Sequence, residues 1–143
     1  MLHRLRTLLL AFALLLAVAP AAAELVVVVN PKSGVERLSR DEVINIFLGR
    51  YRQLPSGQSA QPADLSAAQP EKAAFYRQLV NKELSEINSY WARLVFSGRT
   101  LPPRQATGYE DLLAWVAGTP GGLGYIERAK ADARVKIVFE FVP

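Results

Sequence analysis

Cysteine is absent from all 143 residues, and the single histidine, His3, lies close to the N-terminus. Without cysteine the chain has no disulfide, no thiol nucleophile and no lipobox for lipid attachment. If the N-terminus is removed, the rest of the chain also lacks histidine, which excludes a Ser-His-Asp triad, a Cys-His pair and a metal site built from these residues. We therefore expect a protein that is not an enzyme and holds no metal or cofactor.

Long apolar runs are also scarce, and the one extended example is residues 8–18. It follows a short basic stretch at residues 3–6 and precedes three alanines at residues 21–23, which is the order of a cleavable secretory signal peptide. About eleven apolar residues are too few to cross a bilayer, which takes roughly 20. We expect a signal peptide over residues 1–23, cleavage near Ala23, a periplasmic location and no stable membrane insertion after cleavage.

A strong charge of one sign is missing too. Removing Arg4 and Arg6 with the signal from the 17 basic residues leaves 15, against 13 acidic ones. Nucleic-acid-binding proteins usually show a concentrated basic face, so no nucleic-acid partner is expected. The remaining residues 24–143, about 120 in number, suit one ordinary domain.

Four segments have the patterns of strands. Residues 25–29 are an unbroken run of leucine and valine, typical of a strand buried on both faces. Short strands are indicated at residues 63–65 and 123–126. Alternating apolar residues predict a last strand over residues 135–141, with one wetter face.

Four further segments have the apolar spacing of helices, and their approximate ranges are 39–48, 70–80, 85–96 and 107–117. Capping boxes are predicted at two of the starts, from Ser39 with Glu42 and from Thr107 with Glu110. Pro70 suits the first turn of a helix, where its missing N–H would lack a partner in any case. Alternating strands and helices of these lengths predict a three-layer α/β/α domain with a small mixed sheet.

Ligands of such sheets bind beyond the strand ends, where loops and helix N-termini converge. The candidate loops are those after Val29, before Pro70 and around Gly121.

Three motifs in order resemble one known family. LSRDEVINIFLGR at residues 38–50 resembles the helix that precedes the ligand loop in periplasmic phosphate-binding proteins of ABC transporters. A helix around Phe75 follows, and PGGLGYI at residues 120–126 is similar to that family's PGAIGYV strand. Residues 90–98 resemble a small single-domain subgroup of the same superfamily, the type II periplasmic-binding-protein-like proteins. The resemblance covers most of residues 24–126.

The family fold, as the resemblance implies it, is two lobes that close over an anion, and this chain is long enough for one. The resemblance implies a non-catalytic solute-binding domain for phosphate or a similar oxyanion in uptake or sensing, with an ABC-transporter or other envelope protein as partner. One alternative is an interaction module that has kept the fold, lost the ligand and binds another protein. A third hypothesis, an enzyme using carboxylates or a Ser-Lys pair, would need a serine beside Lys32, Lys72 or Lys82.

The family places a glycine-rich phosphate loop at a helix N-terminus, where backbone N–H groups meet the anion. Here the equivalent stretch, residues 64–70, reads DLSAAQP: both glycines are gone and a proline removes a donor. The candidate ligands are polar residues of this loop and of neighbouring loops, namely Asn30, Ser33, Ser66, Gln69 and Arg99. The alternative interpretation is that Ser66 and Gln69 only cap their own helix.

Paired acidic residues occur at residues 41–42 and 110–111. Both pairs fall in the first turn of a predicted helix, where they complement the helix dipole, so a general acid–base role is disfavoured. Trp91 and Trp115 each lie on the apolar face of a predicted helix, which favours core packing over stacking on a ligand.

Overall fold

The structure is a computed structural model that describes residues 24–141, so the predicted signal peptide lies outside the described residues. The strands are β1 (Leu25–Val29), β2 (Gln61–Leu65), β3 (Arg104–Ala106), β4 (Gly122–Glu127) and β5 (Lys136–Glu140). The helices are α2 (Arg40–Phe47), α3 (Pro70–Val80), α4 (Leu84–Phe96) and α5 (Tyr109–Gly118), with a short 3-10 turn, η1 (Arg128–Lys130).

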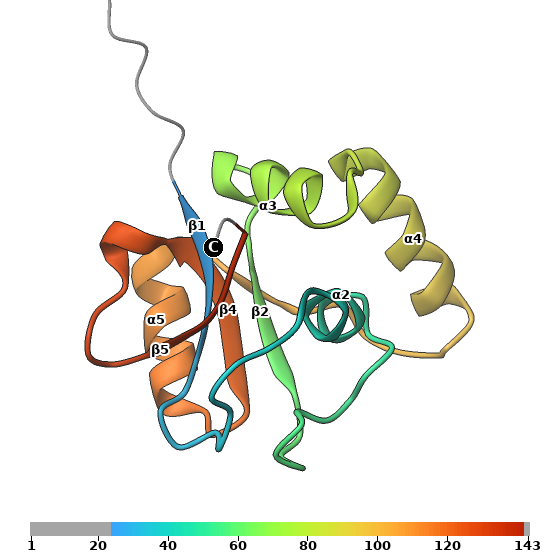
Figure 1. The fold of residues 1–143 in the computed structure, drawn as a ribbon. Helices are drawn as coiled ribbons and strands as arrows, with labels where there is room; N and C mark the ends of the chain where they lie inside the picture. Colours follow the sequence, from blue (N-terminus) through green and yellow to red (C-terminus); the bar gives the residue numbers. More distant parts are fainter. Residues whose placement is uncertain (1–23, 142–143) are drawn as a thin grey trace, which may run out of the picture.

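The strands form one mixed sheet in the order β3-β2-β4-β1-β5. β2 runs parallel to β3 and β4, whereas β1 runs antiparallel to both of its neighbours, β4 and β5. Val29, the last residue of β1, therefore pairs with Leu123 near the start of β4. We call the end of the sheet where β2, β3 and β4 finish the carboxyl end, and the end where they start, beside the end of β1, the amino end (Figure 1).

Helices cover both faces of the sheet, with α5 on one face and α2 and α3 on the other (Figure 1). Successive residues of β4 show why, because side chains alternate between faces along a strand. Gly124 lies against α5, where an added Cβ would come 2.8 Å from Leu112. Tyr125 points the other way: its ring stacks on Phe75 of α3 at 3.8 Å and lies 5.9 Å from Phe47 of α2. The predicted three-layer α/β/α class with a small mixed sheet is confirmed.

The capping box predicted at Ser39 and Glu42 is confirmed. The Ser39 hydroxyl accepts from the Glu42 N–H at 3.1 Å, and the Glu42 carboxylate accepts from the Ser39 N–H at 3.0 Å. The box predicted from Thr107 and Glu110 is wrong, because α5 starts one residue later, with Gly108 as its N-cap. Asp111 therefore takes the third helical position, and its carboxylate accepts from the Thr107 N–H at 3.0 Å.

Two short elements were not predicted. β3 has three residues and follows a proline pair, so it offers no periodic pattern to detect. η1 is a single turn with no buried residue. β3 forms the sheet edge beside β2, and η1 lies at the carboxyl end, directly after β4.

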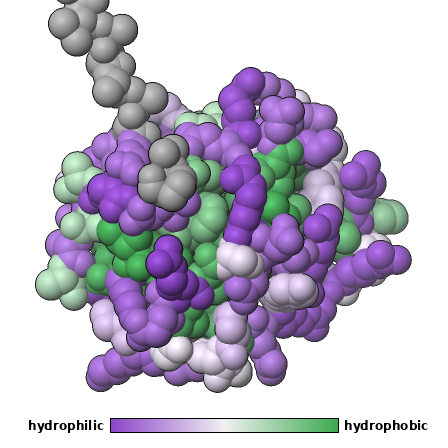
Figure 2. All heavy atoms as spheres, in the orientation of Figure 1, coloured by the Kyte–Doolittle hydropathy of each residue, from purple (hydrophilic) through white to green (hydrophobic). Residues whose placement is uncertain are grey.

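Hydrophilic side chains cover most of the face seen in Figure 2, and hydrophobic ones show through over β1 and β5. β5 is an edge strand whose Ile137 and Phe139 are only partly buried. The core is thus incompletely covered at this edge. Within residues 24–141, no helix combines the length and the apolar character that a membrane span requires.

Candidate functional site

The loop between β2 and α3 lies at the carboxyl end of the sheet and contains two of the predicted ligands, Ser66 and Gln69. The Ser66 N–H donates to the Ala106 carbonyl at 3.0 Å, and the Gln69 amide donates to the Thr107 carbonyl at 3.2 Å. Both bonds fasten the loop to the end of β3. Gln69 is the N-cap residue of α3, but its side chain makes no capping bond. The interpretation that this side chain caps its own helix is therefore wrong.

This loop also carries backbone donors without a protein acceptor. Among residues 24–141, the N–H groups of Ala67 and Ala68 make no hydrogen bond, and both residues are exposed. They lie just before Pro70, the first residue of α3, so the positive end of the helix dipole is close by. Free N–H groups at a helix start are the groups that bind oxyanions in other proteins.

Two features limit how tightly the loop can hold an anion. Glu71 stands in the first turn of α3, and its Oε2 is buried without a hydrogen-bond partner among the described residues. The cavity lined by Gln69, Glu71 and Lys130 has a volume of only about 10 Å³, roughly the minimum for one water molecule. An oxyanion would therefore sit on the outer surface of the loop.

Lys130 supplies a cation at this cavity that the sequence did not reveal. Its ammonium lies 4.5 Å from the centre of the Tyr109 ring and 3.5 Å from a Glu127 carboxylate oxygen. The residue belongs to η1, which follows β4 at the carboxyl end of the sheet. Only knowledge that β2 and β4 run parallel would have placed Lys130 near Gln69.

A buried polar cluster lies at the end of β2, beneath the loop. The Asp64 carboxylate accepts hydrogen bonds from the hydroxyls of Tyr76, at 2.7 Å, and Tyr125, and lies 3.7 Å from the Lys72 ammonium. The Tyr125 hydroxyl in turn accepts from the Leu65 N–H at 3.1 Å. These bonds join β2, α3 and β4, so the cluster fixes the platform that carries the loop.

Burial raises the pKa of the Asp64 carboxyl above its ordinary value, although Lys72 and the two tyrosine hydroxyls act in the opposite direction. Burial also raises the pKa of Tyr76 and of Tyr125, so both hydroxyls remain protonated donors. The cluster holds its proton donors toward Asp64 and presents none of them to solvent. Its role is therefore structural support.

The other predicted ligands lie at the amino end. Asn30 follows β1 and is buried, and its amide donates to the carbonyls of Val116 and Ala117 at 3.0 and 3.1 Å, at the end of α5. The Ser33 hydroxyl is also buried and accepts from the Val35 N–H at 3.2 Å. These side chains close a helix end and a turn.

Arg99 lies in the segment after α4, in a hollow that includes Gln61 and Pro62 at the start of β2. Since β2 has five residues, Arg99 and Ser66 lie near opposite ends of a strand roughly 16 Å long. The structure thus brings Ser66 and Gln69 together and does not bring Asn30, Ser33 or Arg99 to them. For Asn30 and Ser33 the physical reason is the antiparallel direction of β1, which puts the loop after Val29 beside the start of β4. Arg99 is far from Ser66 because it precedes β3, which runs parallel to β2.

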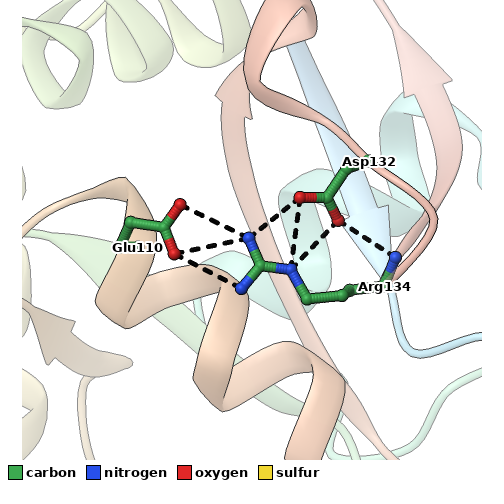
Figure 3. A network of polar contacts seen from close by, with 3 residues as sticks. All are labelled: Glu110, Asp132 and Arg134. Carbon is green, nitrogen blue, oxygen red and sulfur yellow. Dashed lines mark hydrogen bonds and ion pairs between the residues drawn. The ribbon is translucent and has the colours of Figure 1, made fainter.

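Arg134, beside the first turn of α5, is already neutralised. Its guanidinium lies between Asp132, at 2.9 Å, and Glu110, at 3.3 Å (Figure 3). Hydrogen bonds from Arg134 hold the pKa of Asp132 below its ordinary value. Two carboxylates around one guanidinium leave no positive charge for an anion, so we do not count Arg134 among the candidate ligands.

The remaining sequence interpretations concern acidic pairs and tryptophans. The acidic pairs at residues 41–42 and 110–111 do stand in the first turns of α2 and α5. Among residues 24–141, no three acidic, histidine or cysteine side chains gather as a metal site would require. Trp91 belongs to the core, as predicted, whereas Trp115 is only partly buried.

No family model matches the sequence, and none of the curated proteins matches it. Solved structures with a similar fold include three that are 15% or 16% identical to this chain. An ABC-type phosphate transport receptor from Vibrio cholerae is 15% identical, with a TM-score of 0.65, and the match covers 81% of this chain and 45% of that one.

The second is described as a phosphate ABC transporter substrate-binding protein, with bound phosphate, from Clostridium perfringens: identity is 15%, TM-score 0.64, and coverage 81% of this chain and 44% of that one. The third is described as a phosphate-binding protein from Planctomyces limnophilus: identity is 16%, TM-score 0.54, and coverage 81% and 40%. The chain therefore has a periplasmic-binding-protein-like fold, and it spans less than half the length of these three proteins.

Proposed function

We propose that this chain is an exported, non-catalytic solute-binding domain that binds a small oxyanion, such as phosphate, at the loop between β2 and α3. The observation that carries the proposal is the pair of unpaired N–H groups at Ala67 and Ala68, next to the Ser66 hydroxyl and the start of α3. The fold supports it, because the similar structures include a phosphate transport receptor and a substrate-binding protein with bound phosphate. The absence of cysteine, and of histidine after His3, supports a role without catalysis.

The expected affinity is low. Three neutral donors in an open site contribute about 1 kcal/mol each, or slightly more. Their sum of about 3 kcal/mol corresponds to a dissociation constant on the order of several millimolar. One lobe also covers the anion from one side only, and the carboxylate of Glu71 repels it.

The cellular role that fits these features is recognition of an oxyanion in the periplasm, in phosphate uptake or sensing. Export rests on the signal-like sequence of residues 1–23, and the partner would be a transporter or another envelope protein. Cleavage would release residues 24–143, which hold the whole described fold.

The proposal is tested by changing two charges beside the loop in opposite directions. We expect Glu71→Gln to tighten phosphate binding and Lys130→Gln to weaken it, each by at most about fivefold, since a charge pair even at 4 Å contributes only about 1 kcal/mol in water. Isothermal titration of residues 24–143 with phosphate and with sulfate measures both changes.

Asp41→Asn is the matched control, because it removes the same charge from the first turn of another helix, α2. It should leave the affinity unchanged. Two outcomes would contradict the proposal. One is that neither the unsubstituted protein nor Glu71→Gln releases or absorbs heat at tens of millimolar anion. The other is that Asp41→Asn changes the affinity for phosphate as much as Glu71→Gln does.

A further inference from the structure

A hollow of about 730 Å³ opens at the amino end of the sheet, between α4, residues 98–104 and the start of β2. Three arginines line it, Arg52, Arg99 and Arg104, and no aspartate or glutamate does. Its volume is within the range of ligand-binding sites. Since residues 24–143 hold 15 basic and 13 acidic residues, this hollow is a local concentration of positive charge.

Two contacts hold the guanidinium groups of Arg52 and Arg104 in place, whereas Arg99 takes part through its backbone carbonyl. The guanidinium of Arg52 donates to the Arg99 carbonyl at 2.6 Å. The guanidinium of Arg104 lies 4.5 Å above the Trp115 ring, whose indole N–H donates to the Gln61 carbonyl at 3.2 Å. Among residues 24–141, no salt bridge involves any of the three arginines. Positioned guanidinium groups without a carboxylate partner are suited to bind one in bidentate fashion.

Apolar side chains surround the arginines. Leu101 is 79% exposed, Tyr51 51% and Val95 47%, and all three line the hollow. Phe96, next to Val95 at the end of α4, is 95% exposed. The described residues contain only five exposed large hydrophobic side chains, so four of the five lie in or beside this hollow. Such grouping of exposed apolar side chains marks interaction surfaces.

We propose that the hollow is a docking site for an acidic segment of a partner protein, which also inserts an apolar or aromatic side chain. Carboxylates of the segment pair with Arg99 and Arg104, and its apolar side chain covers Leu101 and its neighbours. A small anion could satisfy the arginines but would leave the apolar rim in water. Arginine and aromatic residues at the centre of a contact are also typical of protein interfaces.

This docking site is separate from the proposed oxyanion site. The hollow borders the start of β2, whereas the oxyanion loop follows the end of the same strand. Either site can therefore fail its test without affecting the other.

The test is a selection from an unbiased phage-displayed dodecapeptide library against purified residues 24–143. We expect the enriched peptides to carry several Asp or Glu residues together with Trp, Phe or Leu. The double variant Arg99→Gln/Arg104→Gln should lose at least tenfold in affinity for these peptides, measured by fluorescence anisotropy. The matched control Arg37→Gln/Arg93→Gln removes two exposed arginines outside the hollow and should change the affinity less than twofold.

Three results would overturn the proposal. Enriched peptides without an excess of Asp and Glu would show that the arginines do not select an acidic segment. Equal binding of the peptides to both double variants would show that they bind outside the hollow. Binding of a single-stranded oligonucleotide or of anionic phospholipid vesicles through Arg99 and Arg104, with no enriched peptide, would assign the hollow to another class of partner.

Discussion

Asp64 shows how one buried carboxylate can organise the end of a strand. Its side chain is 3% exposed, yet two tyrosine hydroxyls donate to it and the Lys72 ammonium lies within ion-pair distance. A buried carboxylate without such partners would cost several kcal/mol. Because the partners come from α3 and β4, the carboxylate also fixes where those elements meet β2.

Lys72→Met should destabilise the fold by about 3 kcal/mol or more near pH 7, because it leaves the buried charge of Asp64 without its cation. The loss should be smaller near pH 4.5. The pKa of Asp64 is already raised in the folded state, and removing Lys72 raises it further. The folded state then binds a proton more tightly than the unfolded state, so the free energy of unfolding falls as pH rises above the unfolded pKa of Asp64.

Urea unfolding at the two pH values measures this difference. Lys82→Met is the control, because Lys82 forms an exposed pair with Glu86 at 3.9 Å, and such pairs contribute little. If Lys72→Met lowers the free energy of unfolding equally at both pH values, Asp64 is not the titrating group.

At the scale of elements, strand and helix positions could be predicted because each leaves a local pattern. The valine run of β1, the capping box of α2 and the proline at the start of α3 are examples. The direction of β1 relative to its neighbours leaves no local pattern, since a run of leucine and valine is equally suited to a parallel and an antiparallel strand. It is decided by pairing with residues about 100 positions away in β4 and β5.

The candidate site could be predicted only in part for the same reason. Ser66 and Gln69 lie three positions apart in sequence, and the loop between β2 and α3 keeps them together. Lys130 joins them through the parallel pairing of β2 with β4, and Arg52 meets Arg99 across 47 positions. Contacts between residues so far apart in sequence can be predicted only when the tertiary fold is known.

The turn before β4 offers a direct test of how tightly the elements are packed. A Cβ on Gly121 would lie 1.8 Å from the Ser59 carbonyl oxygen, which is backbone and cannot rotate away. Gly121→Ala should therefore cost about 3 kcal/mol or more in the free energy of unfolding. Gly118→Ala is the matched control, since its Cβ would meet nothing within 4 Å, and its effect should stay within about 1 kcal/mol. Similar urea midpoints for the two variants would contradict this packing.

At the scale of the whole molecule, we propose a different function for each end of the sheet. The carboxyl end carries free N–H groups and a helix start, and the amino end carries a hollow with three arginines and an apolar rim. The chain spans less than half the length of the phosphate receptors that share its fold. The two proposed sites lie at opposite ends of β2, so a partner docked in the hollow would leave the loop between β2 and α3 open.

The central claim is that the oxyanion binds at the carboxyl end and not at the arginines. A phosphate titration of ¹⁵N-labelled residues 24–143, followed through backbone amide chemical shifts, tests it residue by residue. The account predicts saturable shifts for Ala67, Ala68 and Glu71, with residues 98–104 unchanged. Shifts confined to residues 98–104, or no saturable shift at any amide, would contradict it.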